Sequence, residues 1–251
     1  MNHFIKTNKK KKVLIIIPAR LESTRLPNKV LRLISGIPMI VRVAKRAETL
    51  KFAEVIVASG NKEICNVLDN YDVKNILTSK KHKSGTDRIF EVYKKIKKEN
   101  YEIIINLQGD LPIFKDVLIN SLLLIMQDKK TDIGTAVCEL DNDEKSDKNI
   151  VKAEAKLNGG TGFAKNFVRE VSNKKNFFHH IGIYAYRPET LKRFVSFEQT
   201  SEEIKRGLEQ MRALNNDMKI KVIKVSSNPI SVDTIDDLKK IRTLYKKKLF
   251  N

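Results

Sequence analysis

Apolar runs of strand length alternate with segments of helical periodicity along the first half of this chain. The first run, Val-Leu-Ile-Ile-Ile at residues 13–17, is continuous, which is typical of a strand buried on both faces of a parallel sheet. The same pattern predicts strands at residues 54–58, 73–77 and 101–107, and helices at residues 39–50, 62–70 and 86–98. This repeated βα order predicts an α/β domain with a mostly parallel central sheet and helices on both faces.

The second half of the chain is less regular. Its predicted strands cover residues 133–140, 150–155, 180–186 and 219–225. Its predicted helices cover residues 189–195, 202–215 and a last segment from about residue 235, and a glycine-rich turn spans residues 159–162. The sequence has no Pro/Ser-rich linker between the two halves. We therefore predict a single domain over residues 13–251, preceded by a lysine-rich N-terminal tail at residues 1–12.

The formal net charge of +19, from 49 Lys and Arg against 30 Asp and Glu, is high enough to suggest a nucleic-acid partner. Most of the excess, however, is lysine in short runs, for which a solvated surface is the simpler explanation. No apolar run approaches the ~18 to 20 residues of a membrane span, and the first residues lack the apolar stretch and cleavage site of a signal peptide. We therefore expect a cytoplasmic protein with neither nucleic acid nor a membrane as its partner.

The loop after the first predicted strand is dense in cations and hydroxyl groups. It contains Arg20, Ser23, Thr24, Arg25 and Lys29 within ten residues. Arginine offers a bidentate fork to phosphate oxygens and lysine offers a mobile point charge. Loops at the carboxyl ends of parallel strands are where such folds bind ligands. An ordinary charged surface loop would not require this density, so we predict a triphosphate-binding loop.

Two carboxylates follow other predicted strands. Asp110 lies in the Gln108-Gly109-Asp110 segment, and Asp233 lies in a Val-Asp-Thr segment before the last predicted helix. Taken alone, the first is a turn and the second a helix cap. If they share the sheet edge with the cationic loop, they form a natural pair of ligands for Mg²⁺, which favours a few carboxylates plus water and substrate phosphates. The Ser84 to Arg88 segment is either an N-cap or a further ligand contact.

Six sequence blocks, in this order, resemble the 3-deoxy-manno-octulosonate (Kdo) cytidylyltransferase family, the CMP-Kdo synthetases of Gram-negative bacteria. They lie at residues 18–29, 84–88, 108–110, 180–187, 208–212 and 232–234. The resemblance extends from about residue 13 to residue 244. It implies a Rossmann-like fold of the nucleotide-diphospho-sugar transferase type, with a nucleotide-binding half at residues 13–130. Residues 131–225 would form a smaller irregular sugar-binding and dimerisation part, and residues 226–251 would carry a metal motif and the C-terminal helix.

The resemblance also implies a reaction. CTP and the 2-keto-3-deoxy sugar acid Kdo would give CMP-Kdo and diphosphate for lipopolysaccharide biosynthesis, with Mg²⁺ as cofactor and a homodimer as the assembly. The sugar hydroxyl would attack the α-phosphorus in line. Catalysis would then consist of positioning and charge neutralisation.

The family's site residues map onto this sequence block by block. Catalytic roles would fall to Arg20, Lys29 and Asp110, and the metal would be held by Asp110 and Asp233. Nucleotide contacts would come from Ala19, Arg20, Ser23, Thr24, Arg25, Lys29, Ser59, Ser84, Arg88 and Gln108. Sugar contacts would come from Gln108, Lys165, His180, Tyr184, Tyr186, Glu209 and Gln210. For the two tyrosines, strand packing is a serious alternative.

The chain departs from the family pattern at four places. It has Asn28 where the family has glycine and Leu111 where the family has an acidic residue, and Ser59-Gly60 lacks a carboxylate near the nucleotide. Residues 163–170 diverge most, and there Lys165 would replace the arginine that binds the sugar carboxylate. Another ulosonic acid, such as 8-amino-Kdo or a sialic-acid-like sugar, is therefore an alternative acceptor. A catalytically silent homologue and a basic nucleic-acid-binding protein are the alternatives from other classes.

Overall fold

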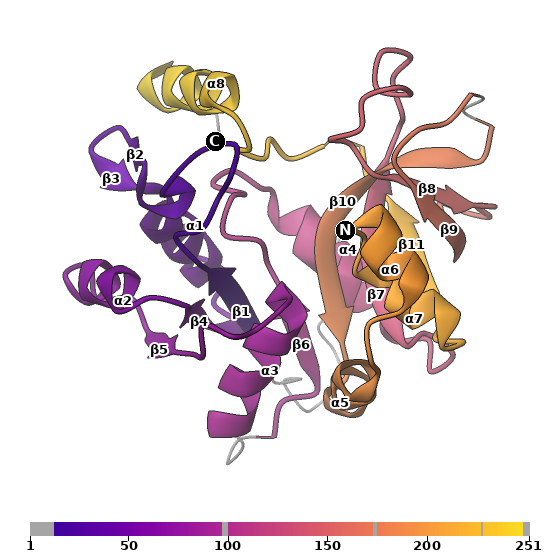
Figure 1. The fold of residues 1–251 in the computed structure, drawn as a ribbon, viewed down its shortest axis with the longest axis horizontal. Coiled ribbons are helices and arrows are strands. Elements are labelled where there is room, and N and C mark those ends of the chain that lie inside the picture. Colours follow the sequence, from indigo (N-terminus) through magenta and orange to yellow (C-terminus); the bar gives the residue numbers. More distant parts are fainter. Residues whose placement is uncertain (1–12, 97–99, 173–174, 227, 248–251) are drawn as a thin grey trace.

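The computed structural model describes residues 13–96, 100–172, 175–226 and 228–247 (Figure 1). The lysine-rich tail predicted at residues 1–12 lies outside the described residues. The main element is a nine-stranded sheet with the strand order β5-β4-β1-β6-β10-β7-β11-β9-β8. The expected α/β architecture is thus confirmed.

The first half of the sheet is parallel. It is formed by β5 (Asn75–Leu77), β4 (Ala53–Ser59), β1 (Val13–Ala19) and β6 (Ile103–Asn106). The central strand β1 supplies alternate side chains to two hydrophobic clusters, with Ile15 in one and Ile16 in the other. Burial on both faces explains why this segment is apolar throughout.

The second half of the sheet is mixed. The long strand β10 (Phe177–Tyr186) runs antiparallel to β6 and to β7 (Ile133–Cys138), and so joins the two halves into one sheet. Beyond it, β11 (Ile220–Lys224) is parallel to β7, while the hairpin of β8 (Lys152–Ala155) and β9 (Thr161–Val168) is antiparallel. The glycine-rich turn predicted at residues 159–162 leads directly into β9, which the sequence pattern did not predict.

Helices cover both faces of the sheet. One hydrophobic cluster joins it to α1 (Met39–Glu48), α2 (Lys62–Asp69), α4 (Asp116–Ile125) and α8 (Ile235–Lys247). The other joins it to α3 (Gly85–Lys95), α5 (Pro188–Ser196) and α7 (Gln210–Asn215), on which α6 (Ser201–Arg206) packs. The single helix predicted at residues 202–215 is wrong. The segment is instead two helices, because Gly207 ends α6 as its C-cap in the left-handed conformation, with φ +60°.

Two connections matter for the position of the site. The loop after β1 passes through the short 3-10 helix η1 (Lys29–Leu31) and the small hairpin of β2 (Leu33–Ile34) and β3 (Ile37–Pro38) before α1. After β11, the chain crosses from the second half back to the first, where α8 packs beside β2 (Figure 1). Every helix among the described residues is too short or too polar to cross a bilayer.

Candidate active site

A cleft of about 380 Å³ opens at the carboxyl end of β1, a volume within the range of ligand pockets. Eleven of the residues singled out from the sequence line it. They are Ala19, Arg20, Ser23, Thr24, Arg25, Lys29, Ser84, Arg88, Gln108, Asp110 and Asp233. The cationic loop, the α3 N-terminus and the two aspartate motifs are therefore brought together, as the parallel-sheet argument predicts.

The cationic loop owes its path to an unusual backbone conformation at Asn28. This residue has φ +54°, in the left-handed region that favours glycine and that asparagine tolerates. Asn28 thus retains the turn that a glycine would make, and η1 starts with Lys29 directly after it.

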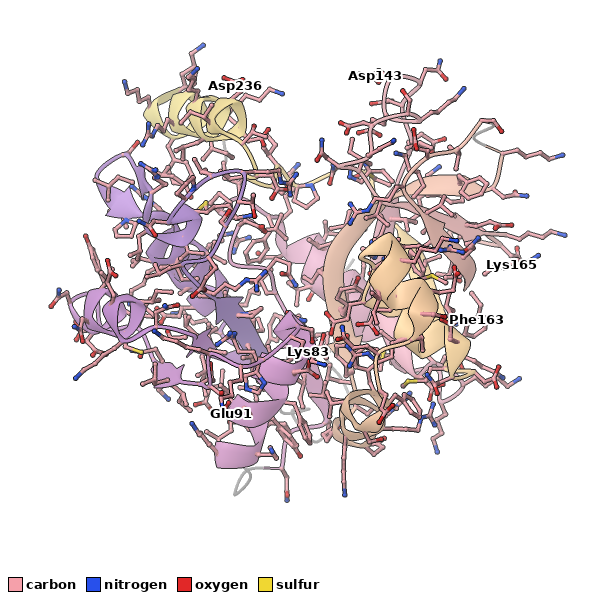
Figure 2. The ribbon with its side chains drawn as sticks, viewed as in Figure 1. Lys83, Glu91, Asp143, Phe163, Lys165 and Asp236 are labelled. Carbon is pink, nitrogen blue, oxygen red and sulfur yellow. The ribbon has the colours of Figure 1, made fainter. Side chains whose placement is uncertain are left out.

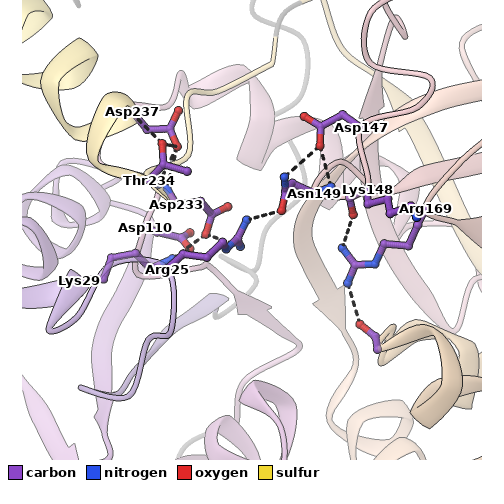
Figure 3. A network of polar contacts seen from close by, with 11 residues as sticks. Arg25, Lys29, Asp110, Asp147, Lys148, Asn149, Arg169, Asp233, Thr234 and Asp237 are labelled. Atoms are coloured by element: carbon purple, nitrogen blue, oxygen red, sulfur yellow. Dashed lines mark hydrogen bonds and ion pairs between the residues drawn. The ribbon is translucent and has the colours of Figure 1, made fainter.

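Lys29 lies between the two predicted metal carboxylates (Figure 3). Its Nζ is 2.7 Å from Asp110 Oδ2 and 2.9 Å from Asp233 Oδ1. Burial by itself would lower the pKa of Lys29, but the two carboxylates outweigh burial and raise it. The ammonium is therefore charged at neutral pH. The backbone N–H of Val232 donates to the carbonyl of Asp110 at 2.9 Å, which joins the two motifs directly.

Asp110 and Asp233 converge closely enough to hold one cation between them. Both lie within 2.9 Å of one nitrogen, so a small cation at the same point would reach both. Among the described residues, no third His, Cys, Asp or Glu completes a metal-binding group with them. That donor set fits Mg²⁺, which takes its remaining ligands from water and substrate phosphates, better than a metal that needs a full protein cage.

Arg25 links the cationic loop to the second half of the chain. Its guanidinium contacts Asp233 Oδ1 at 2.9 Å and donates to Asn149 Oδ1 at 3.0 Å (Figure 3). Asn149 lies in the loop between β7 and β8, and its amide is fixed because its Nδ2 donates to Asp147 Oδ1. The sequence pattern gave no indication of Asn149, because nothing in its neighbourhood resembles a binding motif.

The N-terminus of α3 forms the opposite wall of the cleft. Ser84 caps the helix, since its Oγ accepts from the backbone N–H of Asp87 at 3.1 Å. Arg88 is nearly fully buried and donates to Thr78 Oγ1 and to the carbonyl of Ser79. A Cβ at Gly60 would lie 2.7 Å from the Arg88 guanidinium. The glycine that replaces the family's carboxylate therefore leaves room for this arginine.

Ser59 is one predicted nucleotide contact that the structure places outside the cleft. It is the last residue of β4, it is fully buried, and its carbonyl accepts from Thr78. Its hydroxyl has no hydrogen-bond partner among the described residues. The prediction that Ser59 contacts the nucleotide is therefore corrected: strand pairing turns its side chain into the interior.

Four of the predicted sugar contacts gather at a second, much smaller cavity. Tyr184, Tyr186, Glu209 and Gln210 line it. Tyr184 donates to Gln210 Oε1 at 3.3 Å. One buried carboxylate oxygen of Glu209 has no partner among the described residues, and burial raises the pKa of this group. A hydrogen-bonding group is thus available there for a polyhydroxylated ligand.

The small cavity adjoins the main cleft through a short polar chain. Gln108, on the main cleft, donates to Asn106 Oδ1 at 3.1 Å. Asn106 contacts the hydroxyl of Thr86 at 3.4 Å, and Thr86 lines the small cavity. Gln108 therefore lies between the two cavities.

His180 lies in the interior, beside the small cavity. Its Nε2 is 3.0 Å from Thr135 Oγ1, and its ring packs edge-on against Phe167 and against Tyr184. Complete burial lowers the pKa of His180 to about 3, so the ring is neutral. Tyr186 is 2% exposed. For these two side chains, packing within the strand is what the structure shows.

Lys165 is the second predicted contact that lies away from both cavities. In the β8–β9 pairing, Ala155 faces Ala164 while Glu154 faces Asn166, so Lys165 is the extra residue of a β-bulge. Its side chain is exposed on the outer side of the hairpin (Figure 2). The structure therefore places Lys165 at neither cavity, contrary to its predicted contact with the sugar carboxylate.

Three charged or titratable cleft residues were not predicted from the sequence. Glu22, His82 and Lys83 line the same cleft. His82 and Lys83 directly precede Ser84, so their position next to a predicted ligand segment was the signal that could have found them.

The chain matches the family model described as cytidylyltransferase over residues 14–220. It is 41% identical over 243 residues to the 3-deoxy-manno-octulosonate cytidylyltransferase of Bartonella bacilliformis, covering 93% of this chain and 98% of that relative. It is 40% identical over 242 residues to the protein of that name from Rhizobium etli, covering 92% and 94%. These alignments span nearly the whole length of both chains.

The fold is also found in solved structures. CMP:2-keto-3-deoxy-manno-octonic acid synthetase complexed with CTP superposes with a TM-score of 0.85 at 32% identity, covering 94% of this chain and 99% of that one. A 4-diphosphocytidyl-2C-methyl-D-erythritol synthase from Anaerococcus prevotii superposes with a TM-score of 0.63 at 12% identity, covering 95% and 100%, which shows the fold alone.

Proposed function

The chain belongs to the 3-deoxy-manno-octulosonate cytidylyltransferase family, and from that premise we propose that it transfers CMP from CTP to Kdo and releases diphosphate. The acceptor's hydroxyl attacks the α-phosphorus of CTP, the new P–O bond forms, and the bond to the β-phosphate oxygen breaks. The product is an activated sugar acid for lipopolysaccharide assembly. Because CTP is the co-substrate, the proposal places the enzyme in the cytoplasm.

One observation carries this proposal. The Lys29 ammonium and the Asp110 and Asp233 carboxylates meet at one point on a cleft that Arg20 and Arg25 also line. A triphosphate needs cations for its oxygens, and a metal-bound triphosphate needs carboxylates for the metal. The cleft provides both within one loop cluster.

Arg20 and Lys29 have different roles because they lie at different positions in the cleft. Arg20 is exposed at the end of β1, free to contact the phosphates as CTP enters. Lys29 is held by its two carboxylates, so its charge is fixed in place before the ligand binds. Fixed charge costs no reorganisation when negative charge builds on the leaving diphosphate. We assign Lys29 and Arg20 to that neutralisation.

Asp110 and Asp233 are the residues that would hold Mg²⁺. When bound, the ion would neutralise phosphate oxygens and act as a Lewis acid toward the reacting phosphate. Lys29 and Arg25 both contact Asp233, so two cations of this chain lie beside the carboxylates that would hold the ion.

The acceptor subsite is assigned to the small cavity next to Gln108. The hydroxyl of Tyr184, the amide of Gln210 and the carboxyl of Glu209 offer the donors and acceptors that a sugar acid requires. Its volume of about 10 Å³ means that Kdo must displace the side chains or lie mainly in the adjoining cleft. The homodimer implied by the family is also part of the proposal.

A substrate panel tests the proposal. Purified protein with CTP and Mg²⁺ is expected to release diphosphate with Kdo, and the rate with 8-amino-Kdo and with a sialic acid measures how strictly the acceptor is chosen. ATP, GTP and UTP serve as matched nucleotide controls. Absence of diphosphate with all three acceptors would overturn the proposal and favour a silent homologue.

The basic nucleic-acid-binding alternative has its own test. It requires an affinity for DNA or RNA that persists at physiological salt and falls steeply as salt rises. A variant lacking residues 1–12, with normal turnover, would show that the lysine-rich tail plays no part in catalysis.

A further inference from the structure

His82 lies on the cleft, but neither the sequence motifs nor the proposed mechanism uses it. It belongs to the loop that leads from β5 to α3, two residues before the Ser84 cap. Figure 2 shows the neighbouring Lys83 at the gap between the two halves, with Glu91 on α3 nearby. The imidazole is 21% exposed, so it is accessible from the cleft but mostly enclosed.

The carboxylate of Glu91 is hydrogen-bonded to the ring of His82. Its Oε2 is 2.5 Å from His82 Nε2, and the same oxygen accepts from the backbone N–H of Ser79 at 2.9 Å. The other oxygen is 2.8 Å from Lys95 Nζ. Partial burial would raise the pKa of Glu91, but the hydrogen bonds from Lys95, Ser79 and His82 lower it to about 2. The carboxylate is therefore a permanent acceptor that fixes the orientation of the ring.

This arrangement determines what the other ring nitrogen offers. An ionised carboxylate can only accept, so Nε2 is the nitrogen that carries the proton facing Glu91, and in the imidazole form Nδ1 is left as an acceptor. Among the described residues, Nδ1 has no hydrogen-bond partner. A carboxylate behind a histidine is a common way to select one tautomer for a ligand on the other side.

The position along the cleft limits which part of the nucleotide His82 can meet. β5 is the edge strand, and it is separated from β6, which leads to Asp110, by β4 and β1. At about 4.8 Å between neighbouring strands, the loop after β5 starts roughly 14 Å from the loop after β6. Asp110, Asp233 and Lys29 mark the triphosphate end, so His82 lies toward the nucleoside end.

We propose that His82 is a specificity-determining residue that accepts, through Nδ1, a hydrogen bond from the nucleoside of CTP. The donor is a ribose hydroxyl or the cytosine amino group. Phosphate oxygens carry no proton to donate, so they cannot be the partner of an accepting Nδ1. This inference rests on the proposed function, since it requires CTP in the cleft.

Two substitutions separate the two ring nitrogens. His82→Gln places an amide where Nε2 meets Glu91 and removes the Nδ1 acceptor, whereas His82→Asn keeps an amide oxygen close to the place of Nδ1. We expect His82→Gln to weaken CTP binding about tenfold and His82→Asn to weaken it less, roughly threefold. Lys81→Gln, in the same loop and exposed, is the control for a substitution in this loop that leaves His82 in place. Isothermal titration with CTP and Mg²⁺, without acceptor, measures all four proteins.

Nucleotide analogues then identify the donor. The affinities of 2′-deoxy-CTP, 3′-deoxy-CTP and UTP relative to CTP are measured for the wild type and for His82→Gln. If His82 contacts one of the deleted groups, the loss of affinity for that analogue relative to CTP is smaller in His82→Gln than in the wild type. The reason is that the variant has already lost this hydrogen bond with CTP. Each ratio is taken within one protein, so a general loss of stability cannot imitate the result.

The outcomes are distinct. A reduced penalty for one of the three analogues supports the inference and names the donor. Unchanged CTP affinity in His82→Gln, or full penalties for all three analogues, overturns the inference while leaving the proposed function standing. Failure of the wild type to bind CTP would overturn both.

Discussion

Arg25 and Asn149, 124 residues apart in the sequence, form a hydrogen bond between the two halves of the chain, with Nη1 and Oδ1 separated by 3.0 Å. The bond connects the cationic loop of the first half to the β7–β8 loop of the second. Behind Asn149, the fully buried Lys152 anchors the loop, because its Nζ donates to the carbonyls of Asp147, Ile150 and Arg169. Arg25 is thus positioned by a loop of the second half of the chain.

Asn149→Ala is expected to raise the KM for CTP about fivefold, since Arg25 loses its partner in the second half of the chain. Stability should change little, because Asn149 is exposed. Initial-rate kinetics at varied CTP and saturating acceptor measure the effect. Lys148→Ala, which removes the neighbouring side chain and its ion pair with Glu170, is the matched control. Equal KM values for wild type and Asn149→Ala would contradict the role.

Asp110→Asn tests the metal carboxylates. It keeps the shape of the side chain but removes the charge, and we expect kcat/KM to fall roughly 10²- to 10³-fold, the usual cost of losing one electrostatic group at the reacting phosphates. Diphosphate release at saturating Mg²⁺ measures the loss. Asp116→Asn, at an exposed ion pair with Arg46, should behave like the wild type. Near-normal turnover of Asp110→Asn would exclude this carboxylate from the mechanism.

Glu203→Gln tests the buried ion pair with Arg212, whose Nε and Nη2 lie 2.8 and 2.6 Å from the carboxylate. Removing the charge leaves the buried Arg212 with only its longer ion pair to Asp87 at 3.6 Å, so we expect the free energy of unfolding to fall by about 3 kcal/mol at pH 7. Glu202→Gln, at the exposed pair with Arg206, should cost less than about 0.5 kcal/mol. Urea unfolding of the three proteins compares these values.

The same pair predicts a pH dependence. Burial would raise the pKa of Glu203, but the hydrogen bonds from Arg212 and Gln199 outweigh it and lower the pKa below the ordinary 4.5. A carboxylate with a lowered folded-state pKa stabilises the protein above its unfolded pKa. This contribution is lost as the pH falls through the folded value. The stability difference between wild type and Glu203→Gln should therefore be constant above about pH 5.5 and narrow below pH 4.5. A difference that widens toward acid would show the opposite shift.

Lys165→Ala tests whether the divergent segment at residues 163–170 takes part in acceptor binding. Because Lys165 is the outward residue of the β9 bulge, its removal should leave the KM for Kdo unchanged. Gln210→Ala, on the small cavity, should raise that KM about tenfold. Steady-state kinetics with Kdo varied at saturating CTP compare the two. A raised KM for Lys165→Ala would mean that the side chain reaches the acceptor site of a second copy of the chain.

Much of the nucleotide side could be predicted from the sequence, because its evidence is local. The apolar run of β1 can be stable only between two layers, and the cations follow it within ten residues. Asn28 and Ser84 carry their conformational roles in their side-chain chemistry, as a left-handed turn and a helix cap. Such features need no knowledge of distant residues.

Only the tertiary structure decided the contacts made between distant segments. Asp233 reaches Lys29 and Asp110 because the chain crosses back from β11 to the first half of the sheet. Lys165 points away from the cavities because a single extra residue in β9 changes the side to which it points. The sequence by itself determined which residues have the chemistry to bind a nucleotide. Chain crossing and strand register decided which of them meet, because burial and pairing depend on segments that lie far apart in the chain.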